Sequence, residues 1–108
     1  MIVVLNRLEF LHTLNLSGTQ VTDLSAFGSS GSLQNLKELN ISGCTQLRGD
    51  IIVFKNTPVL ENLDLTETDV TGDILVFKNT PALKELNLFN TLVTGDFPEL
   101  ALNTRNPN

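Results

Sequence analysis

The 108-residue chain carries seven basic and twelve acidic residues, giving a formal net charge of −5, and 41% of its residues are hydrophobic. This length predicts a single domain, and no apolar run reaches the roughly 18 residues that a membrane-spanning helix requires. The acidic balance, the lack of a Lys/Arg cluster and the restriction of the aromatic residues to six Phe argue against binding to nucleic acid or to an anionic membrane. We therefore expect neither partner, and we expect a mild preference for a protein with a basic surface.

The first ten residues contain two apolar side chains three positions apart, Ile2 and Leu5, and Leu11 follows six positions after the second. Because this spacing recurs later in the chain, residues 1–10 are interpreted as a partial repeat or an N-terminal cap. The opening apolar run is too short for the core of a signal peptide. The single cysteine, Cys44, excludes an internal disulfide and favours a reducing compartment, while an extracellular location stays open if the chain is part of a longer protein.

Four copies of one apolar pattern follow, each with three aliphatic residues in the order LxxLxL. They span residues 11–16, 36–41, 60–65 and 83–88. The second leucines of the copies lie 25, 24 and 23 residues apart: they are Leu14, Leu39, Leu63 and Leu86. Alternation of apolar and polar residues is typical of a β-strand, and a period of 20–29 residues indicates a repeat architecture. We therefore expect one domain with repeats at 11–35, 36–59, 60–82 and 83–108.

Behind each expected strand, the second half of the repeat carries an apolar pair three residues apart. The pairs are Leu24/Phe27, Ile51/Phe54, Ile74/Phe77 and Phe97/Leu100. This spacing predicts a short 3₁₀ or helical turn, with the Phe side chains stacked as a spine behind the strands. The tail after Leu100 stops where a fifth strand would begin, so the sequence predicts four strands.

The four tandem copies resemble the leucine-rich-repeat family across essentially the whole chain. Three segments are similar to the LxGxIP element of the plant-type subclass, although its Pro is present only in the last: Leu47–Ile51, Val70–Ile74 and Val93–Phe97. The resemblance implies an α/β fold, a right-handed solenoid or horseshoe with a concave parallel β-sheet and short 3₁₀ or helical turns on the convex side. It also implies a non-enzymatic role in protein recognition on the concave face.

One position departs from the family pattern. Most family members place an inward Asn there, whereas this chain has Thr19, Cys44, Thr68 and Thr91. A Thr hydroxyl can donate to a backbone carbonyl but lacks the second donor of an amide. We therefore expect a weaker ladder of hydrogen bonds and an unchanged fold.

The polar strand positions should form three columns on the concave face. The columns are Thr13/Glu38/Asn62/Glu85, Asn15/Asn40/Asp64/Asn87 and Ser17/Ser42/Thr66/Phe89. From them we predict the partner-binding residues Glu38, Asn40, Asp64, Glu85, Asn87 and Phe89. The alternatives are that these positions are polar only because they face water, with adjacent amides bonding each other, and that Phe89 covers an open end of the stack.

A further column holds an aspartate in every repeat: Asp23, Asp50, Asp73 and Asp96. The favoured interpretation is that each carboxylate caps the short turn after it by accepting backbone N–H bonds. The alternative is calcium bound between neighbouring repeats.

Cys44 and His12 are the only candidates for a nucleophile and a base. The inward position should bury Cys44, and a buried apolar thiol is inert, whereas His12 should be solvated. Two such residues are too few for a zinc site. We therefore expect no enzyme activity, catalytic residue, metal site or cofactor. Two other functions stay open, a structural spacer that self-associates through its ends and the sensor portion of a larger receptor or enzyme.

Overall fold

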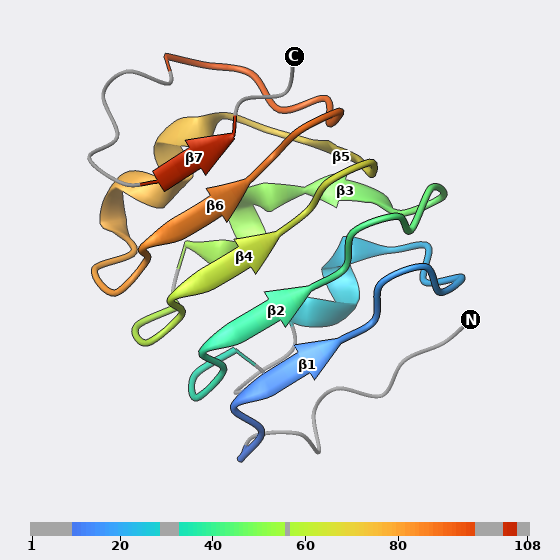
Figure 1. Cartoon of the computed structure of the whole chain (residues 1–108). Coiled ribbons are helices and arrows are strands. Elements are labelled where there is room, and N and C mark those ends of the chain that lie inside the picture. The colour runs from blue at the N-terminus through green and yellow to red at the C-terminus, as the bar shows by residue number, and fades with distance from the viewer. Residues whose placement is uncertain (1–9, 29–32, 56, 97–102, 106–108) are drawn as a thin grey trace.

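The computed structural model describes residues 10–28, 33–55, 57–96 and 103–105 (Figure 1). Its main sheet has five parallel strands in the order β1-β2-β4-β6-β7. The strands are β1 (Thr13–Asn15), β2 (Glu38–Asn40), β4 (Asn62–Asp64), β6 (Glu85–Asn87) and β7 (Asn103–Arg105). The first four lie inside the four LxxLxL copies, so the strand prediction from those copies is confirmed.

The strand β7 shows that the four-strand prediction is wrong. Asn103, Thr104 and Arg105 pair in parallel register with Glu85, Leu86 and Asn87 of β6. The strand was missed because no apolar alternation marks it, and the main-chain hydrogen bonds that form a ladder leave no signal in the side chains. The division into repeats at 11–35, 36–59, 60–82 and 83–108 stays a prediction.

Three 3₁₀ helices lie behind the main sheet, together with a second, two-stranded parallel sheet (Figure 1). The helices are η1 (Leu24–Gly28), η2 (Ile51–Phe54) and η3 (Ile74–Asn79). The second sheet joins β3 (Arg48–Asp50) to β5 (Asp69–Thr71), and single bridges at Asp23↔Arg48 and Asp73↔Thr94 continue it. This second sheet, which was not predicted from the sequence, ties together the segments that precede the helices.

The core lies between the main sheet and the helices. The central strand leucines Leu39, Leu63 and Leu86 are each 2% exposed, and they belong to one cluster with the apolar residues of the helices. Among the described residues, the Phe spine forms as the sequence predicts. Phe27, Phe54 and Phe77 are buried, and the rings of Phe54 and Phe77 stack with their centroids 6.1 Å apart. The pair Phe97/Leu100 and the partial repeat at residues 1–9 lie outside the described residues.

Buried or partly buried side chains satisfy main-chain carbonyls just after β1, β2, β4 and β6. The Thr19, Thr68 and Thr91 hydroxyls donate to the carbonyl three residues earlier, at 2.7, 2.7 and 2.8 Å. The Cys44 thiol donates instead to the Leu16 carbonyl of the neighbouring repeat, at 3.1 Å. A ladder of hydrogen bonds is therefore present at these positions, with one bond that crosses between repeats, and its weakness relative to an Asn ladder stays a prediction.

A second hydroxyl ladder was not predicted. Thr57 and Thr80 are buried, and their hydroxyls donate to the carbonyls of Phe54 and Phe77 at 3.0 and 2.8 Å. Each precedes a proline, which prevents the helix from continuing. The Thr side chain thus satisfies a carbonyl at the helix end that would otherwise be buried without a partner.

Gly72 lies at a close approach between neighbouring repeats, and its replacement by Ala should destabilise the fold. A Cβ there would lie 2.5 Å from Asp50 Oδ1 and 2.8 Å from Ile51 Cγ1, at a φ of +120°. We expect Gly72→Ala to lower the free energy of unfolding by roughly 2–4 kcal/mol. Gly18→Ala is the matched control, because Gly18 has a φ of +69° and nothing within 4 Å, and should cost about 1 kcal/mol. Urea unfolding compares the two, and equal losses would contradict the close approach.

Candidate functional site

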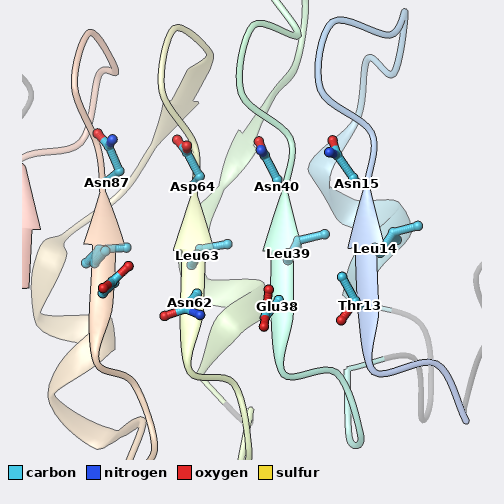
Figure 2. Close-up of a pocket in the computed structure, with 12 residues that line it drawn as sticks. Thr13, Leu14, Asn15, Glu38, Leu39, Asn40, Asn62, Leu63, Asp64 and Asn87 are labelled. Atoms are coloured by element: carbon cyan, nitrogen blue, oxygen red, sulfur yellow. The ribbon is translucent and has the colours of Figure 1, made fainter.

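The parallel register places the predicted columns side by side on the exposed face of the main sheet (Figure 2). Thr13, Glu38, Asn62 and Glu85 form the lower row, and Asn15, Asn40, Asp64 and Asn87 form the upper row. A shallow hollow of about 520 Å³ lies over these rows and the leucines between them. We call this surface, with its eight polar residues, the sheet face.

The alternation of the strands separates the sheet face from the core. Within β2, β4 and β6 the central leucine is buried, while the residues on both sides of it are exposed or half-buried. Polar side chains therefore rise around the hollow and main-chain atoms form its floor. Of the six residues predicted to bind a partner, the structure brings five together here, and they are Glu38, Asn40, Asp64, Glu85 and Asn87.

The upper row is held in place by hydrogen bonds to the chain that follows each strand. The Oδ1 atoms of Asn15, Asn40, Asp64 and Asn87 accept the backbone N–H two residues later, at 2.9–3.1 Å. Adjacent amides bonding each other, the alternative considered above, is therefore not the arrangement seen. Because the backbone N–H requires an acceptor, each Asn oxygen must point to the main chain, and its Nδ2 donor points elsewhere.

Asp64 differs from the other members of the upper row in its charge. Its Oδ1 accepts two bonds, from the Thr66 N–H at 3.0 Å and from the Thr66 hydroxyl at 2.6 Å. These bonds leave Oδ2, the second carboxylate oxygen, on the sheet face. The row therefore presents three amide donors and one carboxylate to a partner.

Phe89 lies just beyond β6 and does not line the hollow. It follows Asn87 by two residues, at the position that Ser17, Ser42 and Thr66 hold in the other repeats. The residue is 38% exposed, and its carbonyl accepts the Glu67 N–H at 2.9 Å. We call this edge of the sheet face the rim.

The turns at the rim change character along the stack. Gly18 and Gly43 have φ values of +69° and +71°, whereas the equivalent positions of the next two repeats are Glu67, at +58°, and Asn90, at +62°. Left-handed backbone disfavours a Cβ, and Glu has no local side-chain bond that compensates as Asn does. Glu67 and Asn90 were not singled out from the sequence, although the replacement of a repeated Gly was a visible signal.

A family model described as "Leucine Rich repeats (2 copies)" matches residues 9–56, which include β1, β2, β3 and η2. The matched stretch is similar to two leucine-rich repeats. The same strand register continues past the matched residues through β4 and β6. No curated protein and no solved structure matched the chain. Leucine-rich repeats generally mediate protein–protein interactions and are typically non-enzymatic.

The aspartate column of the repeats caps the helices in every case that the structure describes. Asp50 and Asp73 are the N-cap residues of η2 and η3, and their Oδ1 atoms accept the N–H of Ile52 and Leu75 at 2.9 and 3.0 Å. Asp23 accepts the Ser25 N–H in the same way. The helix that would follow Asp96 lies outside the described residues. Among the described residues, no group of three His, Cys, Asp or Glu side chains is placed to hold a metal ion.

The two residues considered for chemistry lie in different surroundings. Cys44 is buried, as expected, and its thiol contacts the Leu16 carbonyl and, at 3.6 Å, the Thr19 hydroxyl. His12 is exposed, as expected, and its Nδ1 lies 3.2 Å from the Asn35 carbonyl. The thiol and the imidazole therefore have separate partners. In the part of the chain that the structure describes, no helix has the length and apolar character needed to cross a membrane.

Asp64 should tolerate replacement by Asn but not by Ala. Asn preserves the acceptor for the Thr66 N–H, as Asn40 does for Ser42. Ala removes the acceptor for both the amide and the hydroxyl of Thr66, so we expect Asp64→Ala to lose roughly 1–2 kcal/mol of unfolding free energy. Asp64→Asn should unfold within about 0.5 kcal/mol of the wild type. Denaturant titration measures both, and an equal loss in the two variants would show that the turn does not depend on this acceptor.

The capping carboxylate of Asp23 should make stability depend on pH in acid. The hydrogen bonds from Ser25 hold the pKa of Asp23 below its usual 3.8. A lowered folded-state pKa means that the contribution to stability is complete above pH 3.8 and is lost as the pH falls through the lower folded value. Asp23→Asn keeps an acceptor that does not titrate. The advantage in stability of the wild type over this variant should therefore shrink below pH 3.8, as measured by thermal unfolding. A difference that stays constant with pH would show that the ionised Asp23 carboxylate does not stabilise the fold.

Proposed function

We propose that this chain is a non-enzymatic recognition module that binds a protein partner on its sheet face. The observation that carries the proposal is the unbroken register of polar side chains on β1, β2, β4 and β6 around one shallow hollow. A hollow built on strands holds its side chains in fixed relative positions. The general role of leucine-rich repeats supports the same conclusion.

The proposed contact residues are those predicted from the sequence: Glu38, Asn40, Asp64, Glu85, Asn87 and Phe89. The upper row contributes through preorganisation, because its bonds to the main chain already restrict side-chain rotamers before binding. Less conformational entropy is then lost on association. Phe89 contributes apolar contact area at the rim, since aromatic residues, Phe among them, are enriched in protein interfaces.

The size of the surface limits its affinity. Four strands at a spacing of about 4.8 Å, each with its flanking turns, offer on the order of 300 Å² of flat area. A standard interface buries roughly 800 Å² on each partner. The sheet face alone therefore binds weakly, and tight binding requires the rim as well or a longer array of repeats.

The proposal includes two structural features. The repeats form a right-handed horseshoe with the sheet face on its concave side, and they are of the plant-type subclass. The subclass is supported by the equivalent positions of Gly49, Gly72 and Gly95, whose φ values of +132°, +120° and +123° follow the LxGxI spacing.

A variant of the sheet face should lose its partner without losing its fold. Glu38→Ala, Asn62→Arg, Glu85→Ala and Phe89→Ala alter the lower row and the rim, and they leave every capped turn of the upper row intact. In affinity capture from the source lysate, the wild type should retain a protein partner. The amount of that partner retained by this variant should be at least about tenfold lower, because interface energy concentrates in a few central residues. A control variant carries Asp69→Ala and Lys78→Ala, at two exposed positions outside the sheet face.

Identical captures on all three proteins would overturn the proposal. That result would favour the structural alternative, in which the ends of the stack associate with copies of the chain. Within the described residues, β1 pairs only with β2 and β7 only with β6, so each presents an edge. Light scattering at increasing protein concentration would then detect the association.

A further inference from the structure

The carboxylates of the sheet face are arranged so that no two of them are neighbours across the strands. On β2, β4 and β6 the lower row reads Glu38, Asn62, Glu85, while the upper row reads Asn40, Asp64, Asn87. Acidic and amide side chains therefore alternate both across the strands and along each strand. Like charges directly opposite each other on paired strands destabilise a sheet, and the alternation avoids this cost while it keeps three negative charges around β4.

These three charges are not balanced by any of the residues that line the hollow, and the nearest cationic position in the sheet is Arg105 of β7, which the register places beside Asn87. None of the twelve residues that line it is Lys, Arg or His. Lys84, which precedes Glu85 in the chain, has its Nζ 3.6 Å from Glu61 instead. An occupant of the hollow therefore meets three carboxylates, Glu38 and Glu85 in the lower row and Asp64 in the upper row. The Asn62 amide lies between Glu38 and Glu85 in the lower row.

The exposed atoms of the upper row add a second requirement. The Oδ1 atoms of Asn40 and Asn87 are bonded to the main chain, so their Nδ2 groups are the atoms that remain for an occupant. These groups only donate, and they flank the carboxylate of Asp64. The occupant must therefore supply hydrogen-bond acceptors to β2 and β6 and a cation above β4.

We propose that the occupant of the sheet face is an extended, arginine-bearing segment of a protein partner. An arginine lies above β4, where its guanidinium donates to Asp64 and to Glu38 or Glu85, and main-chain carbonyls of the segment accept from Asn40 and Asn87. The planar fork of arginine suits several separated acceptors better than the point charge of lysine. This inference rests on the proposed function and names the chemical class of the partner.

Two other occupants do not fit the same geometry. A divalent cation needs several oxygen ligands that converge on one point, and among the described residues no group of three His, Cys, Asp or Glu side chains is placed to hold a metal ion. A nucleic acid would bring phosphate charges against three carboxylates and would be repelled. A peptide that carries both cations and carbonyls meets both requirements.

The test uses the full chain and a synthetic probe, the blocked peptide Gly-Arg-Gly-Arg-Gly. Two-dimensional amide NMR spectra would follow its addition to the wild type. The same titration would use a peptide with citrulline, the uncharged analogue of arginine, in both Arg positions. We expect the arginine peptide to shift the amides of β2, β4 and β6, and the citrulline peptide to bind about tenfold more weakly, because exposed ion pairs contribute modestly each. Added salt should weaken only the arginine peptide.

Two triple variants separate local recognition from general attraction to an acidic protein. Glu38→Gln, Asp64→Asn and Glu85→Gln remove the three charges with little change in shape and keep the capped turn after β4. Asp50→Asn, Asp69→Asn and Asp96→Asn remove three exposed charges elsewhere, none of which lines the hollow. We expect about a tenfold loss of arginine-peptide affinity in the first variant and less than about a twofold loss in the second.

Each other outcome overturns the inference in a recognisable way. Equal binding of the citrulline peptide at the same amides would show that the sheet face takes peptides without regard to charge, so the proposed function would stand and the arginine class would fall. Equal losses in the two triple variants would show attraction to net charge alone. If the arginine peptide shifts no amide of the sheet face, the inference is wrong, and the capture experiment decides separately on the proposed function.

Discussion

The structure depends on the parallel register between successive strands. Leu39 lies beside Leu63, and Leu63 beside Leu86, so one repeat covers the apolar side of the next. No single repeat is large enough to bury its own leucines, and stability in such a stack is a sum of interactions between neighbours. The same register positions the polar side chains of the sheet face, because side chains alternate across a strand. Once the leucines are aligned inside, the polar residues on both sides of them must align outside.

The turns of each repeat have to satisfy main-chain groups that no strand or helix pairs. Small hydroxyl side chains perform this task at two places, through Thr68 and Thr91 after the strands and through Thr57 and Thr80 after the helices. Each bond spans three residues, so it depends little on the repeats on either side. No buried side-chain nitrogen or oxygen among the described residues lacks a partner. The repeats can therefore vary in length from 25 to 23 residues without a change in register.

Under the proposed function, the sheet face combines structural and binding roles in the same side chains. Asp64 and the three Asn of its row hold the turns with one side-chain atom and leave the other for a partner. Substitution at these positions therefore affects stability as well as recognition, whereas Glu38, Asn62 and Glu85 of the lower row offer a way to alter recognition alone. The rim adds Phe89 and the left-handed Glu67, which make the two later repeats differ chemically from the two earlier ones.

The sequence by itself determined β1, β2, β4 and β6, the Phe spine, the inward hydroxyl ladder and the polar columns, because each follows from local periodicity. Capping by Asp50 and Asp73 was also predictable, since a cap acts within two residues. Only the tertiary structure revealed β7 and the sheet of β3 and β5, which form through main-chain pairing between segments distant in sequence. It also decided which side-chain atom of each upper-row residue bonds to the main chain. That choice depends on where the chain turns after the strand, and residue types alone do not specify it.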